Sequence, residues 1–393
     1  MWSFLARRLA QAALTLWVFI TVTFIILQLM PGDVTQMYLA DPRIPPEVRE
    51  AMGRQLGLDQ PLGVQYLRYL GNVLTGHLGV SFSQYPTPVW SLIAERLPRT
   101  VTLFFTATVV SFYLGFVLGR HIAWRRGSWL DAMATGVGVT FWTAFYPLVA
   151  LMLVWALAFR AGWLPLNQFV DPAVWRQAPV DANRVFRFLL INLAAAIVVL
   201  AAGLRLGVAK VEGPTARWAT QVALWGSVLA ASAAWWSQSG LAVYAWDIVR
   251  HMVLPVLALS LVSFGGAMLL MRDAMLETVR EDYVVAARAR GLPERIVRDR
   301  YAARNALLPV MTSLTLSIGG VASGGIVTET LFSWPGIGQL LLASAVAQDY
   351  PLAIGAFTFT GIFLIGAHAV ADVLHAVLDP RLRIRGGEIA ALE

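Results

Sequence analysis

Long runs of apolar residues alternate with shorter polar segments along this chain. A helix needs about 20 mostly apolar residues to cross the hydrocarbon core of a bilayer. Candidate runs lie near residues 9–30, 100–120, 132–159, 187–207, 217–236, 252–271, 306–328 and 352–374. This pattern predicts an all-α, polytopic membrane protein with about eight transmembrane helices. An even number of spans places both termini on the same side of the membrane.

Polar segments divide the chain into predicted parts. Residues 1–30 hold an N-terminal segment and the first span, and residues 31–99 form a long polar segment outside the membrane. Residues 100–393 form the transmembrane domain. Within residues 31–99, the stretch EVREAMGRQLGL predicts a short amphipathic helix that ends near Gly57. We expect this segment to form a small cap on the membrane domain.

The polar connection at residues 273–305 has a specific order of residues. Its centre reads DYVVAARARGLPERIVRDR, in which alanines keep one helix surface thin. Gly291 is suited to end that helix in a left-handed conformation. Pro293 is suited to the first turn of a new helix, where its missing N–H costs nothing. The order predicts a helix, a sharp corner, a short helix and a return to the membrane near Asn305. A solvated basic loop is the alternative interpretation.

Composition supports a membrane protein. The chain has 393 residues, of which 58% are hydrophobic and only 13% are charged. A soluble domain carries about 25% charged residues. There is no cysteine, which excludes disulfides and thiolate metal sites.

The net charge of +7 comes from arginines that gather in alternate connections. Positive residues concentrate in cytoplasmic loops, so connection 273–305 and both termini are predicted to be cytoplasmic. The arginines of the predicted cytoplasmic segments include Arg120, Arg125, Arg126, Arg205, Arg217, Arg280, Arg288, Arg290, Arg295, Arg298, Arg300, Arg304, Arg381, Arg383 and Arg385.

Several motifs together resemble one transporter family. The connection contains Asp282-Tyr283-Val284, then Ala287 to Leu292, then RNALLP from Arg304 to Pro309. These are similar to the EAA loop of ABC-transporter permease subunits, and most closely to the binding-protein-dependent permeases of the dipeptide and oligopeptide import family. Other motifs in the same order strengthen the resemblance: LMPGD, LGLDQPL, QYLRYL, ERLPRT, HMVLPVLALSL, TETLFSWPGIG, DYPL and VLDPRLR.

The resemblance implies a role in ATP-driven import of peptides or a related small solute. The chain would form half of the translocation pathway in the inner or plasma membrane. Its partners would be a second homologous permease, two ATP-binding cassette ATPase subunits and an extracytoplasmic solute-binding protein. No nucleic acid is expected. The short helix near Leu292 would be a coupling helix that sits in a groove of an ATPase subunit, and the residues implied for coupling are Asp282, Tyr283, Ala286, Ala287, Gly291, Leu292 and Pro293.

A second set of residues is a candidate gate at the outer mouth. Glu329 lies at the outer end of the seventh predicted span, and the resemblance implies that Trp334 to Gly338 form a turn that dips back into the membrane. The candidate residues are Glu329, Trp334, Pro335, Gly336 and Gly338. The alternatives are interfacial capping by the turn and a solvated Glu329.

Two features depart from the family pattern. His77 stands where an acidic residue is usual, and the family usually has six spans. Residues 186–237 therefore look like an inserted helical hairpin added to a six-helix core. Because a hairpin adds two spans, the orientation of the remaining spans is unchanged.

ATP hydrolysis by this chain itself is not expected. A Walker A motif requires Gly-Lys-Ser/Thr, but the only lysine, Lys210, follows Ala209. The chain is therefore expected to be a transport subunit without enzymatic activity, to bind no cofactor or metal directly, and to depend on ATP used by its partners. A secondary transporter, another polytopic protein not coupled to ATP and a membrane-embedded enzyme are the alternatives. The first would need inverted repeats and buried ionisable groups, and the last would need convergent His, Asp or Glu residues.

Overall fold

The chain forms helices throughout the part described by the computed structural model. This part comprises residues 2–29, 60–81, 83–206, 211, 213–321 and 324–378. Within these residues the only extended pairing is an isolated antiparallel bridge between Val80 and Pro88. The prediction of an all-α polytopic protein is confirmed for the described residues.

The chain divides into two compact units. One unit contains residues 1–152 and 255–393, and the other contains residues 153–254. The long helix α11 (Ala242–Thr278) passes from the second unit into the first. The segment formed by α7 (Tyr146–Leu153) and the π-helical η1 (Val154–Arg160) passes from the first unit into the second.

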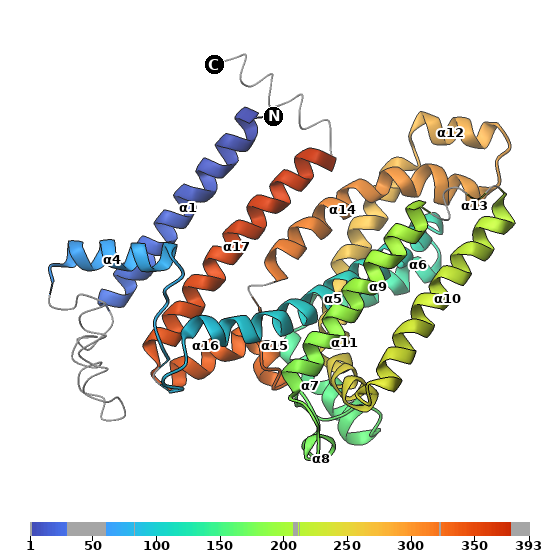
Figure 1. Cartoon of the computed structure of the whole chain (residues 1–393). Coiled ribbons are helices and arrows are strands. Elements are labelled where there is room, and N and C mark those ends of the chain that lie inside the picture. Colours follow the sequence, from blue (N-terminus) through green and yellow to red (C-terminus); the bar gives the residue numbers. More distant parts are fainter. Residues whose placement is uncertain are drawn as a thin grey trace, which may run out of the picture. The chain divides into compact units, whose positions relative to one another are not determined.

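The first unit is a packed set of long and short helices (Figure 1). α1 packs against α17, and α17 also packs against α14, α16 and α5. The elements are α1 (Trp2–Leu29), α4 (Leu62–Leu74), α5 (Val89–Trp124), α6 (Trp129–Thr143), α12 (Asp282–Ala289), α13 (Glu294–Ile296), the π-helical η3 (Val297–Ala302), α14 (Ala303–Gly320), α15 (Ile326–Leu331), α16 (Ile337–Val346) and α17 (Tyr350–Leu378).

The second unit contains a helical hairpin. α9 (Ala182–Leu206) packs against α10 (Pro214–Gln238), as Figure 1 shows. Ser232 on α10 donates a hydrogen bond to Asn192 Oδ1 on α9, and Gly203 faces the side chain of Leu224. Short α8 (Pro172–Trp175) precedes the hairpin. The two helices coincide closely with the hairpin predicted at 186–237, whereas its origin as an insertion stays a prediction.

Helix lengths and hydropathy only partly account for the predicted spans. Among the described residues, five helices are long and apolar enough to cross a membrane, or six if one bent pair counts as a single span. α10 and α14 coincide with predicted spans but are not among those helices. The chain is thus a multi-pass membrane protein, and the number of about eight spans stays a prediction.

Two predicted spans are broken in the structure. The run at 132–159 divides into α6 and α7–η1, which meet at an angle of 106°. Pro147 explains the break, since it lacks the N–H that would bond the carbonyl of Thr143 in a continuous helix. The run at 306–328 ends as a helix at Gly320, and α15 begins only at Ile326 after Gly324 with a φ of +69°. Neither interruption was expected from the apolar character of these runs.

The predicted border at residue 99 falls within helix α5. α5 begins at Val89 and is continuous through Pro98 and Thr100, so ERLPRT lies inside a helix. Residues 31–59 of the predicted segment 31–99, which include EVREAMGRQLGL, lie outside the described residues, as do the C-terminal arginines and Lys210. The domain borders therefore stay predictions.

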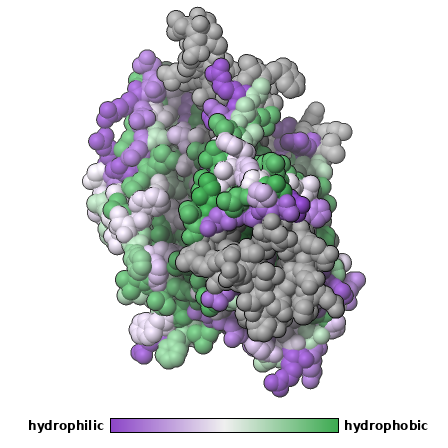
Figure 2. All heavy atoms as spheres, turned by 90° about the vertical axis from the view of Figure 1, so that its left-hand side faces the viewer, coloured by the Kyte–Doolittle hydropathy of each residue, from purple (hydrophilic) through white to green (hydrophobic). Residues whose placement is uncertain are grey.

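Many large apolar side chains point outward rather than into the fold. Leu14, Trp17 and Ile26 on α1 are about half exposed. Hydrophobic residues likewise reach the surface on the face shown in Figure 2. Water would make such exposure unfavourable, whereas lipid is as apolar as these side chains. This surface is typical of a protein whose solvent is a bilayer.

Candidate functional site

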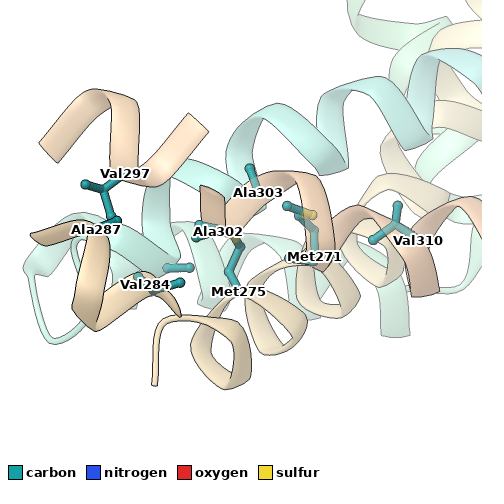
Figure 3. Packing of buried hydrophobic residues seen from close by; sticks show 10 residues of the cluster. Met271, Met275, Val284, Ala287, Val297, Ala302, Ala303 and Val310 are labelled. Atoms are coloured by element: carbon teal, nitrogen blue, oxygen red, sulfur yellow. The ribbon is translucent and has the colours of Figure 1, made fainter. Parts of the chain in front are cut away.

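The α11–α14 connection (residues 279–302) is a compact unit with a core of its own. Val284 and Ala287 on α12 pack against Val297 and Ala302 of η3, and the cluster extends to Met271 and Met275 on α11 (Figure 3). Ala123, near the end of α5, belongs to the same cluster. The connection is therefore a folded knob, and the alternative of a loosely solvated basic loop does not describe it.

The corner between α12 and α13 is built by glycine and proline. Gly291 has a φ of +72°, and its N–H donates to the carbonyl of Arg288 at 2.8 Å. Gly291 thus ends the helix in the left-handed conformation predicted for it. Pro293 precedes α13 as its N-cap residue and is not its first helical residue. The difference of one position arises because Pro293 has an extended ψ of 137°, which turns the chain before the helix starts.

Polar contacts hold helix α12 of the knob against the helices around it. The Arg288 guanidinium lies 5.0 Å from the centre of the Trp124 ring on α5, and its Nε lies 3.3 Å from Glu294 Oε1. Tyr283 Oη accepts a hydrogen bond from Asn305 Nδ2 at 2.7 Å. These contacts join α12 to α5, α13 and α14.

Asp299 is the acidic centre of the knob. Its carboxylate accepts two hydrogen bonds from Arg298, at 2.7 and 3.0 Å, and lies 3.7 Å from Arg120 Nη1 on α5. The hydrogen bonds from Arg298 hold the pKa of Asp299 below its ordinary value, and the positive charges of Arg298 and Arg120 act in the same direction. Asp299 was not singled out in the sequence, where it is one acid among many arginines.

Replacing Asp299 with asparagine should lower the melting temperature at neutral pH by no more than a few degrees, because partly exposed ion pairs contribute little. A carboxyl whose pKa is lower in the folded chain contributes stability above its unfolded pKa. That contribution is lost as pH falls through the folded value. The difference between the wild type and Asp299→Asn should therefore be constant above about pH 5 and shrink below about pH 4. Thermal unfolding in detergent across this range measures it; a difference that grows on acidification would contradict the assignment.

The predicted coupling residues do not all face the same way. Asp282, Ala286, Gly291 and Pro293 are exposed, and Tyr283 and Leu292 are half-buried. Ala287, by contrast, has no exposed surface. Its methyl group fills the core of the knob, and its role in coupling stays a prediction. The buried face of α12 is defined by Val284 and Ala287.

The candidate gate residues form a second compact structure. α15 and α16 pack against each other and, with the turn between them, make up the α15–α16 hairpin (residues 326–346). Trp334 is completely buried; its backbone N–H donates to Glu329 O at 2.7 Å, and its indole Nε1 donates to Arg99 O at 3.1 Å. Trp334 therefore attaches the turn of the hairpin to α5 through this hydrogen bond.

Glu329 lies inside this structure and has no exposed surface. Its Oε1 accepts a hydrogen bond from Thr100 Oγ1 at 2.7 Å, and its Oε2 accepts one from the backbone N–H of Gln339 at 2.9 Å. The alternative of a solvated carboxylate is therefore wrong for this structure. Every bond named here goes to the chain's own groups, so Glu329 acts as a junction between α15, α16 and α5.

The two candidate glycines of the turn make this junction possible. A Cβ on Gly336 would collide with the Glu329 carboxylate and the Thr100 hydroxyl, and one on Gly338 would lie 2.7 Å from Ile326 N. Pro335, between Trp334 and Gly336, accepts a hydrogen bond at its carbonyl from Arg99 Nη1 at 3.2 Å. A gate role for these residues stays a proposal, while their local role is close packing.

Sequence reasoning missed the partners of these residues. Thr100 was seen only as part of a motif, yet it meets Glu329 across 229 positions of sequence. Asp349 of DYPL was also missed: it is buried and accepts hydrogen bonds from the backbone N–H and the hydroxyl of Ser83, at 2.9 and 2.7 Å. On α6, the carboxylate of buried Asp131 accepts a hydrogen bond from Arg272 Nε of α11 at 2.8 Å. Motif order alone held no signal of these pairings.

No residues within the described ranges gather into a group of three or more potential metal ligands. His77, the predicted departure from the family pattern, is exposed, and its Nδ1 lies 2.9 Å from Thr75 Oγ1. Nothing in these observations tests whether the chain binds a cofactor, and that absence stays an expectation.

Comparison with known proteins adds a family to this geometry. The family model described as "Binding-protein-dependent transport system inner membrane component" matches residues 111–384, and the model for the N-terminal part of such membrane components matches residues 1–104. Among curated proteins, the chain is 29% identical over 389 residues to the dipeptide transport system permease protein DppB of Escherichia coli K12, covering 98% of this chain and 99% of that protein.

Two further relatives extend the comparison. The di/tripeptide transport system permease protein DppB of Pseudomonas aeruginosa is 30% identical over 383 residues, with 98% of this chain and 99% of that protein covered. The oligopeptide transport system permease protein AppB of Bacillus subtilis is 28% identical over 367 residues, with 92% of this chain and 93% of that protein covered.

Proposed function

The chain belongs to the family of binding-protein-dependent transport system inner membrane components, and from that premise we propose how it works as a permease subunit of an ATP-driven ABC importer. It forms half of a translocation pathway for peptides, the substrate class in the names of its relatives. A second, homologous permease forms the other half. Two ATPase subunits hydrolyse ATP, and an extracytoplasmic binding protein delivers the solute.

The observation that carries this proposal is the folded knob with apolar residues exposed on it. Val285 and Ile296 are 54% and 36% exposed on a surface otherwise rich in arginine. A knob with its own core can transmit force, and exposed apolar residues rimmed by polar ones are typical of a protein docking surface. The knob is therefore the docking element for an ATPase subunit. Asp282, Ala286, Gly291, Leu292 and Pro293 contribute contacts, while Tyr283 and Ala287 hold its shape.

The orientation follows from the same assignment. The knob faces the cytoplasm, where ATP is available, and both termini lie on that side. The distribution of arginines supports this orientation through the positive-inside rule. The α15–α16 hairpin then lies at the outer side, where it contributes to the gate through which solute enters.

Co-purification with the products of neighbouring transporter genes tests the proposal. A tagged chain should retain an ATPase subunit in stoichiometric amount, and the reconstituted complex should hydrolyse ATP faster when a peptide-loaded binding protein is added. Uptake of labelled peptide that is driven by an ion gradient without any ATPase partner would instead favour a secondary transporter.

A further inference from the structure

Helix α5 is joined at both ends to the two candidate functional structures. It runs without interruption for 36 residues, which corresponds to about 54 Å at 1.5 Å per residue. One end lies in the knob and the other in contact with the α15–α16 hairpin. A single helix thus connects the docking element to the candidate gate.

The knob end of α5 is part of the knob's core. Ala123 belongs to the same buried cluster as Val284, Ala287 and Val297, and the Arg288 guanidinium lies over the Trp124 ring. One turn earlier, Arg120 pairs with Asp299. A movement of the knob relative to this end would have to break apolar packing, a cation–π contact and an ion pair together.

The hairpin end of α5 is held by polar bonds as well as by packing. Val89, Leu92 and Ile93 pack against Ile337 and Leu340 of α16. Thr100 Oγ1 donates to Glu329 Oε1 at 2.7 Å and accepts a hydrogen bond from the backbone N–H of Ile337 at 2.8 Å. The one hydroxyl group therefore bonds α15 and α16 at the same time. It uses its donor and an acceptor site in doing so.

The covalent route between the same two structures is weaker. α14 leaves the knob at Ala303, but its helix ends at Gly320, and the next helix begins at Ile326. A helix transmits force along its axis because each turn is bonded to the next, and a break between helices removes that continuity. α5 has no such break between Thr100 and Trp124.

Building on the function proposed above, we propose that α5 transmits movement of the knob to the α15–α16 hairpin, and that the buried Thr100–Glu329 pair is the junction at which the hairpin receives it. Thr100 and Glu329 are then positioning residues of the outer gate. They need not contact the solute. Loss of the junction separates ATP hydrolysis from hairpin movement without disturbing the docking of the ATPase subunits.

The hydroxyl group of Thr100 gives a sharp set of variants. Thr100→Val keeps the shape of the side chain and removes both hydrogen bonds, whereas Thr100→Ser keeps the hydroxyl. Ser111→Ala is the matched control on the same helix: the Ser111 side chain is buried, but it bonds only the carbonyls of Ala107 and Thr108 of α5 itself. A purely structural effect of losing a buried hydroxyl from α5 should appear in Ser111→Ala as well.

The experiment uses the complete complex in proteoliposomes. Spin labels at Leu74→Cys and Val346→Cys, which replace side chains that are 67% and 78% exposed, report the distance from α4 to the end of α16. The chain has no cysteine of its own. In the wild type and in Ser111→Ala, trapping the ATPase subunits with ATP should shift this distance. In Thr100→Val the shift should be absent and peptide uptake should fall by about tenfold or more, the range of an allosteric coupling energy; Thr100→Ser should restore both.

The outcomes separate a failure of the junction from a failure of the proposed transport function. If Thr100→Val shows the wild-type distance shift and wild-type uptake, the junction is not needed and the inference is overturned. The inference is also overturned if Ser111→Ala loses the shift to the same degree, or if Thr100→Val no longer binds the ATPase subunits. If the wild-type complex itself shows no ATP-dependent uptake, it is the proposed function that fails.

Discussion

Replacing Trp334 with alanine is expected to destabilise the chain by about 3–5 kcal/mol, the usual cost of deleting a fully buried aromatic side chain. Trp334 has no exposed surface, and its indole N–H satisfies the carbonyl of Arg99 inside α5. The substitution opens a cavity at the turn of the α15–α16 hairpin and leaves that carbonyl without its indole donor. In a chain of marginal stability, a loss of this size should sharply reduce the folded fraction recovered from the membrane.

Two further variants test how much of this stability comes from burial of the Trp334 ring and how much from its indole N–H group. Trp334→Phe keeps most of the apolar volume and loses the donor, so it should cost about 1–3 kcal/mol. Trp163→Ala removes a tryptophan that is 72% exposed and should have little effect. Thermal unfolding in detergent, followed by size-exclusion chromatography, ranks the three. Equal melting temperatures for Trp334→Ala and Trp163→Ala would refute the buried role of Trp334.

Ala286→Trp is expected to abolish ATP-coupled uptake while the chain remains folded. Ala286 is exposed on α12, one residue before buried Ala287. A bulky ring at this position should prevent the knob from entering a groove on the ATPase subunit. A loss of 2 kcal/mol in docking, typical of one important interface residue, corresponds to about 30-fold weaker binding.

The adjacent alanine supplies the control for this prediction. Ala287→Trp places the same ring inside the knob, where overpacking should cost about 1–3 kcal/mol or more of stability. The two variants should therefore fail in opposite ways: Ala286→Trp melts like the wild type and does not retain the ATPase subunit, whereas Ala287→Trp melts early. Binding of the ATPase subunit at wild-type affinity by Ala286→Trp would remove Ala286 from the docking surface.

Much of the architecture could be predicted because hydropathy, and the residues that begin or end a helix, act over short stretches of sequence. The apolar runs marked the long helices α1, α5, α9, α11 and α17, and the Gly291 corner was identified by its residue type. The two broken runs were missed. Apolar character alone does not distinguish one straight helix from two shorter ones. A proline does not decide the matter either, because Pro98, Pro255 and Pro309 lie inside continuous helices, whereas the helices on either side of the break at Pro147 meet at 106°.

The candidate site was only partly predictable for the same reason. The positions of Glu329 and Trp334 within a motif suggested a turn, but not that both would bond to α5. Similarly, Ala286 and Ala287 are identical in type and adjacent in sequence, and only the packing of η3 against α12 made one exposed and the other buried. Residue type shows which interactions a side chain can make, whereas the packing of the helices decides which neighbour it makes them with.

By itself, the sequence determined that this chain is helical, multi-pass and organised around a cornered, arginine-rich connection, because those properties arise from interactions within a few residues or between side chains and lipid. Only the tertiary structure decided that the connection is a packed knob, that Glu329 is buried against Thr100, and that α5 links the two. Those contacts join positions as far apart as 229 residues. Their formation depends on which helices pack together, and no local pattern encodes that choice.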